Sequence, residues 1–68
     1  MIYRYYSTQR PIMPGCFPKP NNNKVVEIFN FDDRTMVESI GRPAWGFVSY
    51  AFPLSQSDIS SYELVPEK

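Results

Sequence analysis

Histidine is absent from this sequence, and cysteine occurs once, at Cys16. A single thiol cannot form an internal disulfide, so the small disulfide-stapled secreted proteins are excluded and a reducing, cytoplasmic setting is expected. One thiol without any imidazole also excludes an ordinary zinc site, and we expect no metal and no cofactor. Because histidine is the usual base near neutral pH, its absence predicts that the protein is not an enzyme.

Long hydrophobic runs and an excess of one charge are missing as well. No stretch approaches the roughly 20 apolar residues that span a bilayer, and Met1–Arg4 does not resemble the start of a signal peptide. Seven basic and seven acidic residues give a formal net charge of zero. We therefore expect no membrane partner, and nucleic acid is a less expected partner than protein, since it would require a local basic patch.

Glycine is scarce, and its three copies are isolated from one another, so no phosphate-binding loop is present. Asp32 and Asp33 are adjacent, which in a strand points them apart and in a turn leads them to bind backbone amides. Cys16 lies near Lys19, whose charge favours the thiolate, but no base accompanies it. No catalytic residue is predicted.

Aromatic side chains and prolines are what the chain has in quantity. Hydrophobic residues make up 43% of the 68 residues and aromatic residues 16%, enough for one small core in which aromatic burial contributes most. Residues 1–68 are expected to form a single domain.

Strand-like segments account for most of the chain. Residues 2–8, 24–31 and 44–51 are rich in β-branched and aromatic residues, and residues 35–40 are predicted to return from a turn at 32–34. A short helix is predicted from Ser55 to residue 61 or 62, because Ser55 is an N-cap residue followed by an acid three positions later. Residues 63–65 are predicted to be extended at a sheet edge. The prediction is an α+β domain with a three- or four-stranded, mainly antiparallel sheet, one short C-terminal helix and a long proline-rich loop.

The strand at 24–31 is apolar on both faces, which predicts a central position in the sheet. The bulky residues of the two best strands and of the helix are predicted to share one core, namely Val26, Ile28, Trp45, Phe47 and Ile59. The loop at 11–23 holds four of the seven prolines. Its hydrophobic residues predict that it packs onto the domain, with Phe17 as the anchor.

Two groups of residues have the character of a binding surface. Tyr3, Arg4, Tyr5 and Arg10 alternate aromatic rings with guanidinium groups, as single-strand binders do. The alternative is a strand that buries its tyrosine rings, so the position of these rings discriminates between nucleic-acid and protein binding. Arg42 is close to Trp45, a pairing typical of interface hot spots, although a lone tryptophan is more often core. The hypothetical binding residues are Tyr3, Arg4, Tyr5, Arg10, Phe17 and Arg42.

Several segments together resemble a small family of uncharacterised proteins from conjugative elements and phages of Firmicutes, similar to the large polyvalent protein-associated domains. These segments are Tyr3–Pro11, Phe17–Lys19, Val26–Phe31, Ala44–Gly46 and Tyr62–Pro66. The resemblance implies a mobile-element setting and an accessory, adaptor or inhibitor role, and it carries over no catalytic residues.

The leading hypothesis is a non-enzymatic protein-interaction module that binds its partner through an exposed sheet edge or the loop from Pro11 to Pro20. The alternative hypothesis is a single-stranded nucleic-acid-binding protein that uses the N-terminal tyrosine and arginine residues.

Overall fold

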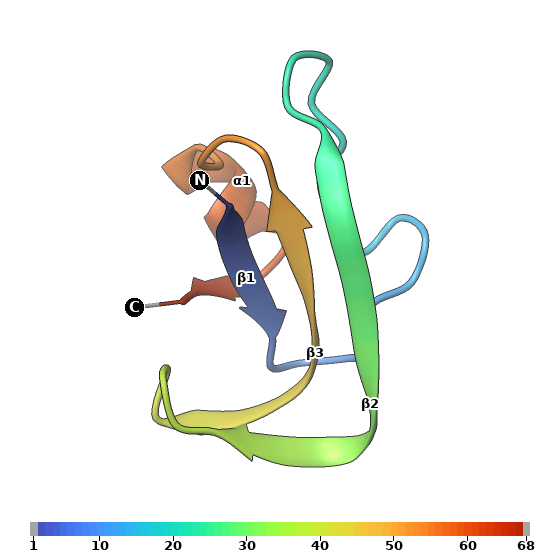
Figure 1. The fold of residues 1–68 in the computed structure, drawn as a ribbon, viewed down its shortest axis with the longest axis vertical. Helices are drawn as coiled ribbons and strands as arrows, with labels where there is room; N and C mark the ends of the chain where they lie inside the picture. Colours follow the sequence, from blue (N-terminus) through green and yellow to red (C-terminus); the bar gives the residue numbers. More distant parts are fainter. Residues whose placement is uncertain (1, 68) are drawn as a thin grey trace.

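A four-stranded antiparallel sheet forms the framework of the computed structural model, which describes residues 2–67 (Figure 1). The strands are β1 (Tyr3–Ser7), β2 (Val25–Val37), β3 (Arg42–Tyr50) and β4 (Leu64–Pro66), and the helix α1 (Gln56–Ser61) precedes β4. Their order across the sheet is β2-β3-β1-β4, with every neighbouring pair antiparallel. The predicted α+β class is confirmed, and β2 and β4 are the two edge strands.

The hairpin between β2 and β3 differs from the prediction of a turn at 32–34 followed by a separate strand at 35–40. Residue pairing with β3 shifts register between Asn30 and Thr35, so Asp32 and Asp33 lie in an irregularity within one long strand. The turn comes later, where the Gly41 amide donates to the Val37 carbonyl at 2.9 Å and Gly41 has φ +71°. Extra residues in one strand of a pair bend it, and Figure 1 shows the far ends of β2 and β3 turning across the sheet.

The predicted central position of residues 24–31 is wrong, because β2 lies at an edge. The inner strands are β3 and β1, and β1 pairs with both β3 and β4. Apolar side chains on both faces of β2 therefore do not indicate burial on both faces.

One face of the sheet, here called the loop face, is covered by the loop between β1 and β2 and by α1. The larger core lies there and consists of Tyr5, Ile12, Phe17, Val48, Tyr50, Leu54 and Leu64. Ile59 of α1 packs against this core, as predicted. The predicted N-cap is also confirmed, since the Asp58 amide donates to Ser55 Oγ at 3.1 Å. In the described part of the chain, no helix has the length and apolar character to cross a membrane.

The opposite face, here called the open face, has a smaller core beside the bent hairpin. This core consists of Tyr6, Ile40 and Ala44, with Phe31, Val37, Phe47 and Val65 packed around it. Two cores form because consecutive strand residues point to opposite faces.

The prediction of a single core is therefore wrong, and so is its membership. Phe47 packs on the smaller core and Ile59 on the larger one. Val26 and Ile28 are exposed, at 49% and 45% of their surface. Trp45 is half-buried and belongs to neither core.

Candidate functional site

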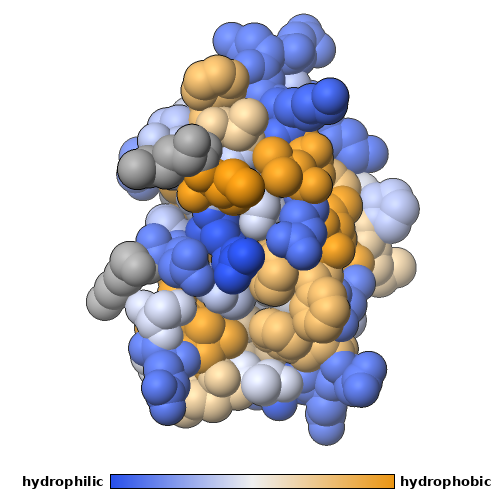
Figure 2. All heavy atoms as spheres, viewed as in Figure 1, coloured by the Kyte–Doolittle hydropathy of each residue, from blue (hydrophilic) through white to orange (hydrophobic). Residues whose placement is uncertain are grey.

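Exposed hydrophobic side chains concentrate on β2. Val26, Ile28, Phe29 and Met36 all belong to this strand and are among the large hydrophobic residues left exposed. Figure 2 shows hydrophobic residues gathered over β2 and β3 on the face toward the viewer. Apolar residues exposed on a strand in this density are typical of an interaction surface.

The backbone of β2 is available on one side, because only β3 pairs with it among the described strands. Edge strands that avoid partners usually carry lysine or proline. The stretch Val25–Phe31 contains neither, and its one charged residue, Glu27, lies 3.9 Å from Arg4. This stretch therefore has neither lysine nor proline at its free edge, and its pairing with β3 is regular from Glu27 to Asn30, after a register shift between Val25 and Glu27.

A small apolar hollow of about 140 Å³ lies between Ile28 of β2 and the loop. In Figure 1 the loop passes behind β2 and projects beyond its free edge. The residues that line the hollow are Ile12, Met13, Pro14, Phe17, Lys19 and Ile28. A chain segment lying along β2 would meet this hollow on the loop face.

The side chain of Asn30 holds the loop against β2. Its Oδ1 accepts from the Ile12 amide at 2.7 Å, and its Nδ2 donates to the Ile12 carbonyl at 2.9 Å. Gly46, the β3 partner of Asn30, leaves the space for this arrangement. A Cβ on Gly46 would lie 2.7 Å from Asn30 Oδ1 and 2.3 Å from the Phe29 carbonyl oxygen.

Two further contacts stiffen the loop. Pro14 and Gly15 form a tight turn in which the Cys16 amide donates to the Met13 carbonyl at 2.9 Å, and Gly15 has φ +86°. Proline followed by a glycine with positive φ is the signature of a type II turn. The buried Tyr50 hydroxyl donates to the Pro18 carbonyl at 2.5 Å and so holds this part of the loop. Burial raises the pKa of Tyr50, and the negative charge of Asp58 is the next cause. The hollow is thus preformed.

Lys19 is the charged residue at this hollow. Its ammonium nitrogen lies 5.4 Å from the centroid of the buried Phe17 ring, a cation–π contact. Lys19 is exposed and has no ion pair among residues 2–67. The hollow therefore combines an apolar lining with one positive charge at its rim.

On the open face, Arg4 lies against one ring of an aromatic cluster. Phe29 stacks on Phe47 with centroids 5.6 Å apart, and the Arg4 guanidinium carbon lies 4.1 Å above the Phe47 ring. Glu27 and Glu67 approach the same guanidinium at 3.9 and 3.8 Å. Two carboxylates thus offset the single positive charge, and this part of the face is not basic.

The predicted ladder of tyrosine and arginine does not form on one surface. Tyr3 and Tyr5 point to the loop face, whereas Arg4 points to the open face. Tyr5 is buried, and its hydroxyl accepts from the Leu54 amide at 2.8 Å. Arg10 lies apart from this strand, in an exposed ion pair of 2.6 Å with Glu63. This placement corresponds to the alternative in which the strand buries its tyrosine rings.

The remaining predicted binding residues lie in different environments. Phe17 is buried in the larger core, as predicted for the loop anchor. Arg42 is exposed at the start of β3 and has no ion pair within the described residues. The prediction missed Ile28 and Phe29 as surface residues, although the apolar residues on both faces of their strand are also typical of an edge that binds a partner.

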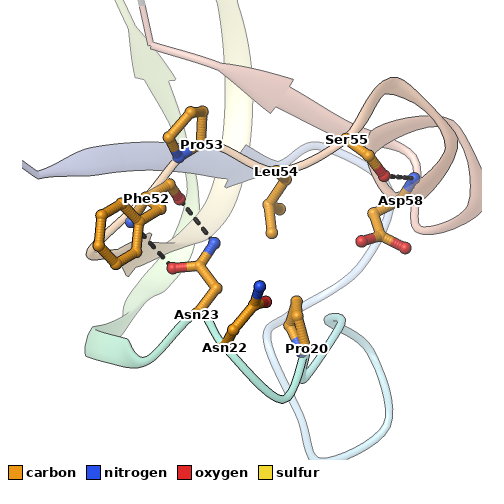
Figure 3. Close-up of a pocket in the computed structure, with 8 residues that line it drawn as sticks. All are labelled: Pro20, Asn22, Asn23, Phe52, Pro53, Leu54, Ser55 and Asp58. Carbon is orange, nitrogen blue, oxygen red and sulfur yellow. Dashed lines mark hydrogen bonds between the residues drawn. The ribbon is translucent and has the colours of Figure 1, made fainter.

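A second hollow, of about 420 Å³, lies between the asparagine-rich end of the loop and the segment after β3 (Figure 3). The amide of Asn23 forms two hydrogen bonds with the Phe52 backbone, of 2.7 and 2.8 Å, and Ser55 caps α1. Because these polar side chains bind the chain's own backbone, we assign this hollow a structural role.

Comparisons with known proteins place the chain in a family. No curated protein and no solved structure matches it. The model of the family described as "Defence against restriction A C-terminal" matches residues 1–68. This description agrees with the phage part of the expected setting, which included conjugative elements as well as phages. The chain therefore belongs to the defence against restriction A C-terminal family, which is part of a phage defence-against-restriction system.

Proposed function

We propose that this chain is a non-enzymatic protein-interaction module within that phage system, and that β2 is the strand it offers to its partner. The observation that carries the proposal is the exposed apolar edge of β2, which a monomeric sheet would normally protect. An accessory role as an adaptor or inhibitor requires only such a surface.

Electrostatics favours protein over nucleic acid as the partner. Affinity for nucleic acid comes largely from cations that neutralise phosphates. Arg4 is flanked by two carboxylates and Arg10 is paired with Glu63, so neither contributes a free positive charge. An apolar strand edge, in contrast, gains affinity from backbone hydrogen bonds and from burial of its side chains.

The proposal that the protein is not an enzyme is supported by two features. The sequence has no histidine to act as a base, and the adjacent residues Asp32 and Asp33 have a structural environment. Asp33 Oδ1 accepts from the Arg34 amide at 2.7 Å, and both Asp32 and Asp33 are exposed in the irregular part of β2. An exposed carboxylate that binds its own backbone is typical of structural use.

Site-specific photocrosslinking tests the proposed contact strand. A benzoylphenylalanine replaces Val26 on β2, and a matched variant carries it at Gln56, which is exposed on α1. After irradiation in lysate of phage-infected cells, we expect a discrete protein adduct at position 26 that is absent at position 56. Equal labelling at both positions would contradict β2 as the contact strand.

A parallel titration tests the alternative partner. Fluorescence anisotropy with labelled single-stranded oligonucleotides is expected to show no binding at micromolar protein and moderate salt. Micromolar binding that weakens steeply with salt and is lost in Arg4→Ala would replace the proposal with the nucleic-acid function.

A further inference from the structure

We infer that the edge of β2 binds an extended peptide segment as an added strand, with an aliphatic side chain in the hollow beside Ile28 and an acidic side chain near Lys19. This inference rests on the proposed function and specifies the chemistry of the partner. It follows from the backbone of β2, the shape of the hollow and the local charge.

The backbone supplies the first argument. Between Glu27 and Asn30, where β2 pairs regularly with β3, the free edge of β2 has no proline to interrupt a ladder of hydrogen bonds. Ile28 is opposite Val48, which belongs to the larger core, and Phe29 is opposite Phe47, which packs on the smaller core. Ile28 therefore points to the loop face and Phe29 to the open face. Alternate side chains of an added strand would meet the Ile28 side and the Phe29 side in turn.

The hollow supplies the second argument. It lies on the loop face, it is apolar apart from Lys19, and its volume of about 140 Å³ suits one branched aliphatic side chain. Its walls are already ordered, because Asn30 binds Ile12 and the turn at Pro14 is closed by a hydrogen bond. A preformed pocket reduces the entropy that binding costs.

Charge supplies the third argument. Lys19 at the rim and Lys24 just before β2 are exposed, and neither has an ion pair in the described part of the chain. An acidic residue in the bound segment would complement them, whereas a basic residue would be repelled.

The position of the loop argues against a second copy of the chain as the occupant. Two β2 strands pairing antiparallel about a two-fold axis would bring both loops to the same face of the joint sheet. Each loop projects beyond the free edge of its own β2 (Figure 1), so the two loops would meet. A single extended segment brings no second loop.

Synthetic peptides test the inference directly. The probes are fluorescein-labelled eight-residue peptides of alternating threonine and leucine, with one glutamate placed at each position in turn, and binding is measured by anisotropy. We expect the best glutamate peptide to bind about two- to five-fold more tightly than its glutamine analogue, as exposed charge pairs do. That preference is expected to disappear in Lys19→Gln.

Matched variants separate strand addition from nonspecific apolar binding. Ile28→Thr is expected to weaken the peptide at least ten-fold, while Met36→Thr, a similarly exposed change far along β2, leaves it unchanged. N-methylation of every second peptide amide, on the side that would donate hydrogen bonds to β2, is expected to abolish binding. Circular dichroism verifies that both protein variants are folded.

The outcomes distinguish this inference from the proposed function. Peptides that do not bind, or that bind regardless of N-methylation, overturn the inference even if the adduct at position 26 forms. Dimerisation in analytical ultracentrifugation that is lost in Ile28→Thr also overturns it, because a second copy is then the occupant. Absence of the adduct at position 26 instead contradicts the proposed function.

Discussion

Asn30 is the single residue whose chemistry does most to position the loop. One side-chain amide satisfies both the donor and the acceptor of the Ile12 backbone, and Ile12 is buried in the larger core. A buried peptide group without partners is costly. The apolar hollow therefore depends on a polar side chain from the neighbouring strand.

Asn30→Ala is expected to lower the free energy of unfolding by about 1–3 kcal/mol, because it leaves the Ile12 backbone groups unsatisfied. Urea denaturation measures the loss, and hydrogen exchange at the Ile12 amide should accelerate in the same variant. The control is Asn22→Ala in the exposed part of the loop, where a change within about 0.5 kcal/mol is expected. Equal effects of the two substitutions would contradict the role of Asn30.

In the β2–β3 hairpin, the two glycines Gly41 and Gly46 are required for different reasons. Gly41 provides the positive φ of the turn and has open space around its Cβ position. Gly46 has no such φ, but the Phe29 carbonyl occupies the place of its Cβ. The close approach of these two strands therefore requires the absence of a side chain at residue 46.

Gly46→Ala is expected to cost about 3 kcal/mol, because the added methyl group contacts backbone that cannot rotate away. Gly41→Ala is the control for positive φ alone, with an expected cost of about 1–2 kcal/mol. Thermal and urea unfolding of the two variants provide the comparison. A smaller loss for Gly46→Ala than for Gly41→Ala would show that the strands separate easily at this point.

At the scale of the whole molecule, Tyr50 joins the sheet, the loop and the helix. It is fully buried in the larger core, it binds the Pro18 carbonyl, and Asp58 of α1 contributes to the rise of its pKa. Burial is the larger cause, since it removes water from the charged phenolate. The neutral form is thus strongly favoured in the folded state.

This pKa shift predicts loss of stability in alkaline solution. In the unfolded chain the phenol ionises near pH 10, while in the folded chain it stays protonated, so its contribution is complete below about pH 10 and is lost as the pH rises further. Tyr50→Phe should lose about 1 kcal/mol at neutral pH through the missing hydrogen bond, but should have a weaker alkaline dependence. Melting temperatures of both proteins from pH 7 to 11 test this, and parallel curves above pH 10 would contradict it.

The properties that the sequence alone determined are those that depend on neighbouring residues. The strand content, the N-cap at Ser55 and the α+β class all follow from local propensity and capping. Such interactions join residues a few positions apart, so the printed order of residues contains them.

Only the tertiary structure decided which strand is at the edge and which side chains are exposed. Alternation within residues 24–31 separates two faces but does not say what covers either one, so the sequence predicts Val26 and Ile28 in the core although both are exposed. The order β2-β3-β1-β4 depends on pairing between β1 and β3, which lie far apart in the chain. The candidate site results from that order, because β3 pairs with β2 on one side and with β1 on the other, and no strand within residues 2–67 pairs with the other side of β2.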